Sequence, residues 1–242
     1  MTERNWNEDE SKIFIDQGKV FTPRRDELRD AFLDLIPAER DEAFQVVELA
    51  SGAGWLSAAI LERYPNASIL ALDGSVEMRA ETARSLAPYP GRWETRAFEL
   101  LDTNWRANLP NDLRAIVSSL AIHHLKGTAK RGLFADLHSH LSPGGALLIA
   151  DLVEPASPAA LRHAARAWDE DVERQSRELS GSPASWEFFR DDHWNIYTWP
   201  DLEMDFPSPL VDQIDWLRQT GYTRIDIPWA RAGHTLIAAY RP

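Results

Sequence analysis

The sequence of 242 residues contains no cysteine, and it lacks any long hydrophobic run. The absence of cysteine excludes disulfide scaffolds, thiolate metal sites and cysteine nucleophiles. No apolar stretch approaches the roughly 20 residues that a membrane-spanning helix needs. The first ten residues are polar and acidic, which is atypical of a secretory signal or a basic transit peptide. We therefore expect a cytoplasmic protein with no membrane partner.

Basic residues are scarce, because 26 lysines and arginines stand against 38 aspartates and glutamates, for a net charge of −12. Such a surface repels phosphate backbones, so we expect no nucleic-acid partner. The hydrophobic content of 44% is enough for a sizeable core and argues against disorder. Ten tryptophans are present, and composition alone does not explain them.

The middle of the chain alternates short apolar runs with segments of helical character. The expected strands are 44–50, 68–73, 93–100, 114–122 and 146–150. The expected helices between them are 55–64, 75–87 and 128–141. A loose or helical arm, 1–22, and a helix from Pro23 to near Pro37 precede this region. Alternation of this kind predicts βαβ units and a parallel sheet covered on both faces.

The pattern changes after residue 155. A helix is expected over 159–179, followed by an irregular aromatic stretch to Pro207. An amphipathic helix then runs from Leu210 and stops at Gly221. Two further runs, 224–229 and 234–240, predict a closing antiparallel hairpin.

A glycine turn, Glu48-Leu-Ala-Ser-Gly52-Ala-Gly54, ends the first expected strand. Glycines let a ligand approach the backbone, and the next helix offers free amides. Gly-x-Gly after a strand also fits a dinucleotide fold. Trp55 crowds the position of a pyrophosphate, and the charge of Glu48 repels it while suiting an amino group or sulfonium. An NAD-linked oxidoreductase is therefore disfavoured.

Two further signals lie at the ends of expected strands. Asp73 follows Gly54 by 19 residues (73 − 54), where a carboxylate can accept the ribose hydroxyls of an adenosine. The alternative is a turn or capping aspartate before Gly74. The pair His123-His124 ends the fourth strand, where ligands bind in parallel sheets, although a hydrogen-bonded loop is the plainer interpretation.

Four motifs in this order resemble the class I S-adenosylmethionine-dependent methyltransferases. They are Glu48–Gly54, Leu72–Met78, Ser118–Leu125 and Leu141–Gly145. The resemblance runs from Phe44 to Pro155 and resumes over 210–240. It implies an α/β, Rossmann-like, doubly wound sheet of seven strands in the order 3-2-1-4-5-7-6. Strand 7 is antiparallel, and a helical and aromatic insert follows strand 5.

The resemblance also implies S-adenosyl-L-methionine as the cofactor. It places Glu48 near the methionine amino group and Asp73 at the ribose. The remaining residues that it places around the cofactor are Ala50, Ser51, Gly52, Gly54, Gly74, Ser75, Met78, Glu99, Leu100, Ser119, Leu120 and Ala121. Asp102 would take the place of Glu99 if the match to the family motif were shifted. Ala50 stands where the family usually has glycine. Arg25, with Arg24, either meets the cofactor carboxylate or is an exposed first-turn arginine.

The implied mechanism is an in-line attack on the sulfonium methyl, which depends mainly on proximity and alignment. A general base is needed only when the acceptor must lose a proton. His123 and His124 are the catalytic candidates, and we favour His123.

The segment 155–207 lies outside the family scaffold and holds four tryptophans. Its charge is −6, from 5 arginines and 11 acids (5 − 11), half of the total. We expect it to form a substrate lid with the N-terminal arm, over a cationic or aromatic small molecule. The candidate substrate residues are Phe14, Phe21, Trp168, His193, Trp194, Asn195 and Tyr197. Alternatively, the tryptophans are the core of the insert and its acids a solvated face.

We expect one methyltransferase domain over 1–242, with four parts: 1–43 (arm and helix), 44–154 (cofactor-binding core), 155–207 (lid) and 208–242 (closing helix and hairpin). The oligomeric state is not determined by the sequence, and a homodimer is one alternative. No metal is expected, because His163 and His193 lack compact ligand spacing. The favoured function is methylation of a small molecule. Action on tRNA or protein is disfavoured by the charge, and a catalytically silent cofactor-binding module stays open.

Overall fold

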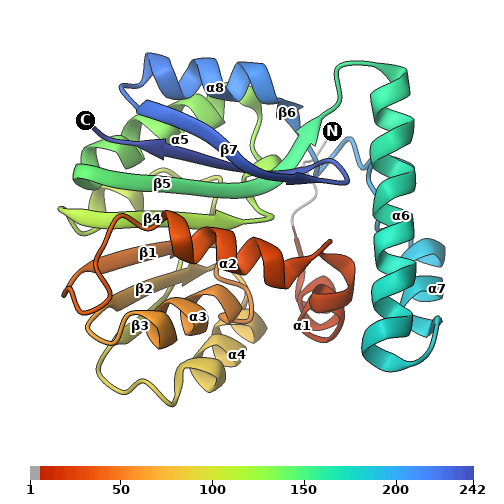
Figure 1. The fold of residues 1–242 in the computed structure, drawn as a ribbon, viewed down its shortest axis with the longest axis horizontal. Helices are drawn as coiled ribbons and strands as arrows, with labels where there is room; N and C mark the ends of the chain where they lie inside the picture. The colour runs from red at the N-terminus through yellow and green to blue at the C-terminus, as the bar shows by residue number, and fades with distance from the viewer. Residues whose placement is uncertain (1–5) are drawn as a thin grey trace.

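The computed structural model describes residues 6–242, which form one open sheet with helices on both faces (Figure 1). Its strand order is β3-β2-β1-β4-β5-β8-β7, and the short β6 pairs with β5. The strands are β1 Gln45–Leu49, β2 Ser68–Asp73, β3 Trp93–Ala97, β4 Leu113–Ser119, β5 Leu141–Glu154, β6 Ser208–Pro209, β7 Thr223–Arg231 and β8 His234–Tyr240. β1 to β5 are parallel, and β8 runs antiparallel to both β5 and β7. The predicted order and closing hairpin are confirmed, while the two-residue β6 is an addition.

The helices are α1 Glu8–Phe21, α2 Arg25–Leu35, α3 Trp55–Arg63, α4 Val76–Leu86, α5 Gly127–His140, α6 Pro158–Ser180, α7 Ala184–Asp191 and α8 Leu210–Gln219, with short 3-10 turns η1 Arg106–Asn108 and η2 Ile122–His124. Three of the helices, α1, α4 and α6, begin at residues whose side chains cap them. Ser75 caps α4, as predicted, by accepting the backbone amide of Met78 at 3.0 Å. Asn7 and Glu10 form a capping box at α1.

The sheet is buried on both faces, which explains its continuous apolar strands. In β1, Val46 packs with the helices α2 and α3, whereas its neighbour Val47 packs on the opposite face with α5 and α8. Successive side chains of a strand point to opposite faces, so each must be apolar here. No helix of residues 6–242 is both long and apolar enough to cross a membrane.

Four expectations differ clearly from the structure, and one of them is β3, which was expected over 93–100 but ends at Ala97. β5 starts at Leu141, directly after α5, and not at Ala146. Gly145 permits this path, because a Cβ there would lie 2.8 Å from the carbonyl oxygen of Leu113. β4 ends at Ser119, and the predicted irregular stretch before Pro207 contains the helix α7.

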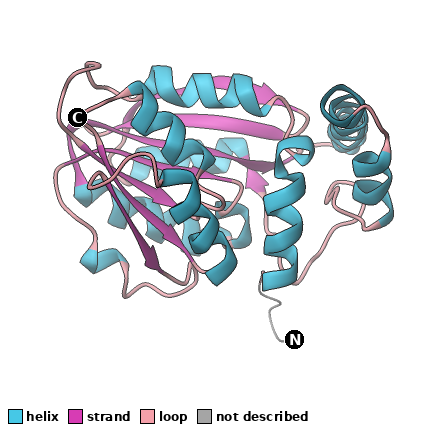
Figure 2. Ribbon diagram, turned by 90° about the horizontal axis from the view of Figure 1, so that it is seen from below, coloured by secondary structure: helices cyan, strands magenta, loops and turns pink. Residues whose placement is uncertain are grey.

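The insert stands beside the carboxyl ends of the strands, and α1 lies between it and the rest of the fold (Figures 1 and 2). α6 holds α1 through Trp168, whose indole donates to the carbonyl of Phe21 at 2.8 Å. Gln175 donates to the carbonyls of Val20 and Thr22 at 2.7 and 3.1 Å. Because these contacts join the arm to the insert, the two segments form one cover over the strand ends.

Candidate functional site

A cavity of about 920 Å³ lies over the carboxyl ends of β1 to β4, beneath α1 and the insert. Most residues predicted from the sequence line it. On the predicted cofactor side these are Arg25, Ala50, Ser51, Gly52, Asp73, Gly74, Ser75, Met78, Glu99, Leu100, Ser119, Leu120 and Ala121. On the predicted acceptor side they are Phe14, Phe21, His123, His124, Trp168, His193 and Trp194. Four predicted residues do not line it: Glu48, Gly54, Asn195 and Tyr197.

Asp73 organises the glycine turn. Its carboxylate accepts the backbone amide of Gly52 at 2.8 Å and that of Ser75 at 2.9 Å. Gly52 has a φ of +55°, a conformation that glycine adopts without steric cost. Burial raises the pKa of Asp73 to about 6, so its carboxylate is mostly charged at neutral pH. The turn and the acid are thus prearranged at the cavity wall.

The turn also contains a strained residue and an unpaired hydroxyl. Ala50 has a φ of +52°, in the left-handed region that disfavours residues with a Cβ. The hydroxyl of Ser51 is buried and has no hydrogen-bond partner within residues 6–242. A buried hydroxyl without a partner is costly, so this atom is available to a polar ligand in the cavity.

Gly54 and Glu48 have other positions than predicted. A Cβ at Gly54 would lie 3.1 Å from the Cα of Thr82, so this glycine lets α3 approach α4. Glu48 is buried behind the cavity wall and accepts the hydroxyl of Ser57. Burial raises the pKa of Glu48 to about 8, which leaves it uncharged at neutral pH. Its buried position outside the cavity lining and its raised pKa weaken the charge argument against a dinucleotide.

Arg25 is half-buried in the cavity wall and is not the exposed arginine of the alternative reading. Its guanidinium lies 4.5 Å from the ring centroid of Trp55. Burial lowers the pKa of Arg25 to about 10, and nearby Glu48 partly opposes that effect. No side-chain hydrogen bond or salt bridge occupies it among the described residues, so it can receive a ligand carboxylate. Glu99 lines the cavity, whereas Asp102 does not, which favours the register with Glu99.

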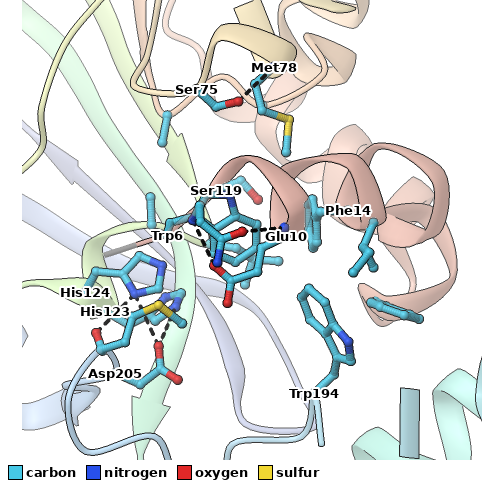
Figure 3. Close-up of a pocket in the computed structure, with 18 of the residues that line it drawn as sticks. Trp6, Glu10, Phe14, Ser75, Met78, Ser119, His123, His124, Trp194 and Asp205 are labelled. Atoms are coloured by element: carbon cyan, nitrogen blue, oxygen red, sulfur yellow. Dashed lines mark hydrogen bonds and ion pairs between the residues drawn. The ribbon is translucent and has the colours of Figure 1, made fainter. Parts of the chain in front are cut away.

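His123 is held by a carboxylate that the sequence analysis missed. Asp151 of β5 accepts the backbone amide of His123 at 2.7 Å, and its other oxygen lies 2.5 Å from Nδ1. This arrangement keeps a proton on Nδ1 and turns Nε2 toward Asp205, 3.6 Å away. His124 Nδ1 lies 3.2 Å from the same Asp205 oxygen (Figure 3).

The charges around His123 decide its protonation. Burial acts to lower the pKa of His123, but Asp151 and then Asp205 outweigh it, and the pKa is raised. Conversely, burial acts to raise the pKa of Asp151, and the imidazole outweighs it, so that pKa is lowered. A buried histidine with one nitrogen held by a carboxylate is the usual arrangement of a general base.

Asp205 comes from a loop that is fastened to the histidine turn. The backbone amide of Phe206 donates to the carbonyl of His123 at 2.8 Å. The ammonium of Lys130 donates to the carbonyl of Phe206 at 2.6 Å and to the hydroxyl of Ser208 at 2.8 Å. The loop is thereby anchored directly after Asp205. No local sequence pattern pointed to this carboxylate, whereas Asp151 could have been found because it directly follows the strand expected over 146–150.

The arm spans both halves of the cavity. The carboxylate of Glu8 accepts the hydroxyl of Ser75 at 2.7 Å and the first amides of α4, those of Val76 and Glu77, at 2.8 and 3.2 Å. Trp6 lies between the two halves, with its ring 6.1 Å from the ring of His124 (Figure 3). The sequence predicted a cover but did not indicate these two residues.

Some side chains of the insert line the cavity, and others hold the insert in place. Trp194 lines the cavity, and its ring lies 6.1 Å from that of Trp6. Asn195 instead donates to the carbonyl of Ala165 at 2.9 Å, and Tyr197 donates to the carbonyl of Gly233 at 2.7 Å. Both side chains fasten the insert, so the predicted substrate contacts of Asn195 and Tyr197 are wrong.

The side chains of His123, His124 and Asp205 also form a group that could hold a metal ion. Among residues 6–242, His123, His124 and Asp205 bring three potential ligand atoms within 4.8 Å of one another. The pairing of His163 with His193 considered from the sequence is not the arrangement found. Two imidazoles and a carboxylate are ligand types that divalent transition metals accept.

Comparisons with known proteins find a methyltransferase domain in this chain. Residues 46–145 match the family model of a methyltransferase domain. An uncharacterized methyltransferase of Mycobacterium bovis is 32% identical over 119 residues, covering 49% of this chain and 55% of that protein. Trans-aconitate 2-methyltransferase of Deinococcus radiodurans is 31% identical over 144 residues, covering 60% of this chain and 48% of that protein. The chain thus spans about half the length of the curated relatives it matches.

Solved structures share the fold. An O-methyltransferase family 2 protein from Planctomyces limnophilus, in complex with apigenin, has a TM-score of 0.63 at 18% identity over 98% of this chain and 62% of that one. An N-methyltransferase of Haemonchus contortus, in complex with S-adenosylhomocysteine, has a TM-score of 0.63 at 12% identity over 98% and 58%. Residues 46–145 are therefore identified as a methyltransferase domain, and the strand order and the four motifs resemble those of the class I S-adenosylmethionine-dependent methyltransferases.

Proposed function

We propose that this protein transfers a methyl group from S-adenosylmethionine to a small-molecule acceptor. The observation that carries the proposal is the Asp73 carboxylate, bonded to the Gly52 amide and lining the cavity at the end of β2. The cofactor, when bound, supplies a methyl group on a positively charged sulfur. Asp73 would hold the ribose hydroxyls, the unpaired hydroxyl of Ser51 would meet a polar group, and Arg25 would bind the carboxylate.

His123 is proposed as the general base for an acceptor that must lose a proton. Its Nε2 faces Asp205, which also lines the cavity, and Asp151 orients the ring and stabilises the imidazolium that forms. His124 faces the same oxygen of Asp205 and flanks the acceptor position. In this proposal Asp151 is a positioning residue, because it acts through the imidazole.

The charges of the cavity wall support a cationic or aromatic acceptor. Arg25 is the only lysine or arginine among the described lining residues. The lining carboxylates are Glu8, Asp9, Glu10, Asp73, Glu99, Asp192, Asp201, Glu203 and Asp205. A polycarboxylate such as the trans-aconitate named for one relative would be repelled here. The aromatic residues of the wall favour stacking and cation–π contacts instead.

Two experiments test the proposal. Native mass spectrometry of the purified protein should detect S-adenosylmethionine or S-adenosylhomocysteine, and NAD in its place would overturn the cofactor assignment. Incubation with methyl-labelled S-adenosylmethionine and a panel of small molecules should yield a labelled product. Label found on tRNA or protein instead would favour a macromolecular acceptor. Cofactor binding with no labelled product would favour a silent module. The cytoplasmic location and the oligomeric state stay predictions.

A further inference from the structure

We propose that the methylated atom is the nitrogen of a protonated amine, and that Asp205 binds this ammonium group beside His123. The inference rests on the proposed function and names its acceptor. It starts from two groups that face each other across the acceptor end of the cavity, the Nε2 atom of His123 and a carboxylate oxygen of Asp205, 3.6 Å apart.

The distance between these atoms is too long for a direct hydrogen bond. When His123 is neutral, its Nδ1–H donates a hydrogen bond to Asp151, so Nε2 presents a lone pair to the carboxylate of Asp205. Two hydrogen-bond acceptors then face one another with no hydrogen between them. A ligand that brings two hydrogens satisfies both, and the pair therefore selects a donor with at least two.

An ammonium group carries three hydrogens and meets this requirement. One N–H donates to Asp205 while another points to Nε2 of His123. A single hydroxyl carries one hydrogen and leaves either the carboxylate or the imidazole without a partner, which is costly at a buried position. The side chains of both residues are only about 6–7% exposed, so water compensates little.

The charge environment of Asp205 favours a cation. Among the described residues, its carboxylate has two imidazoles as partners, and no lysine or arginine is paired with it. Beside its partner His124, the ring centroid of Trp6 lies 6.1 Å from that of His124, 6.0 Å from that of Phe14 and 6.1 Å from that of Trp194 (Figure 3). Aromatic faces beside a carboxylate attract an ammonium ion by cation–π and direct electrostatic contacts.

The chemical step balances without any other reactant. Nε2 of His123 takes one proton from the ammonium group, which leaves a lone pair on nitrogen. The nitrogen forms a bond to the donated methyl carbon while the carbon–sulfur bond breaks, and the electron pair of that bond stays on sulfur. The product is a secondary ammonium ion that still donates to Asp205, and the proton on His123 passes to solvent.

Binding can be tested without turnover, with matched ligands that differ only in the reacting group. The probes are tryptamine, tryptophol and indole-3-propionate, with a parallel phenyl series of phenethylamine, 2-phenylethanol and 3-phenylpropionate. Calorimetry with the full chain saturated with S-adenosylhomocysteine measures each affinity. In at least one series we expect the amine to bind about tenfold or more tightly than its alcohol, and the carboxylate least. The proposal is overturned if no amine exceeds its alcohol.

The substitution Asp205→Asn should weaken amine binding about tenfold or more and leave alcohol binding within about twofold. Asp212→Asn is the matched control, since Asp212 is an exposed carboxylate on α8 outside the cavity lining. The Asp212→Asn variant should bind both the amine and the alcohol as tightly as the unchanged protein does. Equal amine affinity in Asp205→Asn and the unchanged protein would contradict the assignment. Unchanged S-adenosylhomocysteine binding in the variant shows that the cofactor site is intact.

Two further outcomes separate this proposal from others. Methyl transfer from [methyl-13C]S-adenosylmethionine should place the label on nitrogen, and label on oxygen or carbon overturns the inference while leaving the proposed function in place. Treatment with EDTA followed by Zn²⁺ or Mn²⁺ tests the cation alternative. If activity depends on the added metal, Asp205 is a metal ligand and its ammonium role is wrong. Absence of S-adenosylhomocysteine binding would contradict the proposed function itself.

Discussion

Asp151 holds His123 at two points: one carboxylate oxygen accepts the backbone amide at 2.7 Å, and the other lies 2.5 Å from Nδ1 of the ring. The acid comes from β5 and the histidine from the turn after β4, and these are neighbouring parallel strands. The sheet thus places a histidine and its carboxylate side by side at the edge where ligands bind. This pair is the strongest chemical feature of the acceptor end.

Removing either member should slow methyl transfer. We expect His123→Ala to lower kcat by about 10²- to 10⁴-fold, as for the loss of a general base. Asp151→Asn should lower kcat by a smaller factor, because the base remains but its imidazolium loses a counter-ion. Both variants should bind S-adenosylhomocysteine normally in calorimetry. An equal loss of binding and turnover would contradict the assignment of His123 as a base.

The pH profile checks the same pair. A base must be neutral, so kcat/KM should fall as the pH drops through the pKa of His123. Burial and Lys130 act to lower that pKa, but Asp151 and Asp205 outweigh them and raise it. The acid limb should therefore lie above the usual histidine value, and Asp151→Asn should shift it to lower pH. An acid limb that stays in place in the variant would exclude His123 as its source.

Glu48 makes stability depend on pH. Its folded pKa of about 8 lies above its ordinary value of 4.5, so its contribution is fully present below pH 4.5 and is lost as the pH rises through 8. A single proton changes the free energy of unfolding by up to about 1.4 kcal/mol per pH unit in this window. Glu48→Gln should remove that dependence. Urea unfolding at pH 5, 7 and 8.5 should show the free energy of unfolding of the variant rising relative to that of the unchanged protein as the pH rises.

Ala50 should be a site of relievable strain. Because its φ is +52°, Ala50→Gly should raise the free energy of unfolding by about 1 kcal/mol, after allowing for the greater flexibility of glycine when unfolded. Cofactor affinity should not fall, since the turn keeps its path. Ala53→Gly is the control, because Ala53 belongs to the same turn and has no positive φ. Destabilisation by Ala50→Gly would show that the alanine methyl group makes a needed contact.

Glu8 should govern how firmly the arm closes. Glu8→Gln removes a charged acceptor from the first amides of α4, where negative charge is favourable. We expect faster dissociation of S-adenosylhomocysteine, by about 3- to 10-fold, measured by stopped-flow tryptophan fluorescence. Asp16→Asn changes an exposed carboxylate of the same helix and should have no effect. Unchanged dissociation in Glu8→Gln would show that closure of the arm does not depend on this bond.

The parts of the fold that the sequence predicted are those with strong local signals. β2 has the predicted bounds, Ser68–Asp73, because a run of five buried residues ends at an acid followed by glycine. Ser75 caps α4 as its residue type indicates. The extension of β5 was missed because Ser142-Pro-Gly-Gly145 is typical of a turn, and only pairing with β4 and β8 keeps it extended.

The residues of the site also fall into those that the sequence could place and those that it could not. Residues at strand ends, such as Asp73 and His123, could be placed from the order of strands alone. Asp205 could not, because its position depends on a long loop fastened by Lys130 and Phe206. Asn195 was misassigned because a polar residue among aromatics suits a ligand as well as a buried anchor. Only its bonds to Ala165 and Asp169 distinguish the two.

The central claim is that Asp73 and the glycine turn bind S-adenosylmethionine. Calorimetric titration of the full chain with S-adenosylhomocysteine tests it most directly, alongside Asp73→Asn and with NADH as the competing ligand. The account predicts one site per chain, a loss of about tenfold or more in affinity in Asp73→Asn, and no binding of NADH. Equal affinity in the variant, or preference for NADH, would contradict it.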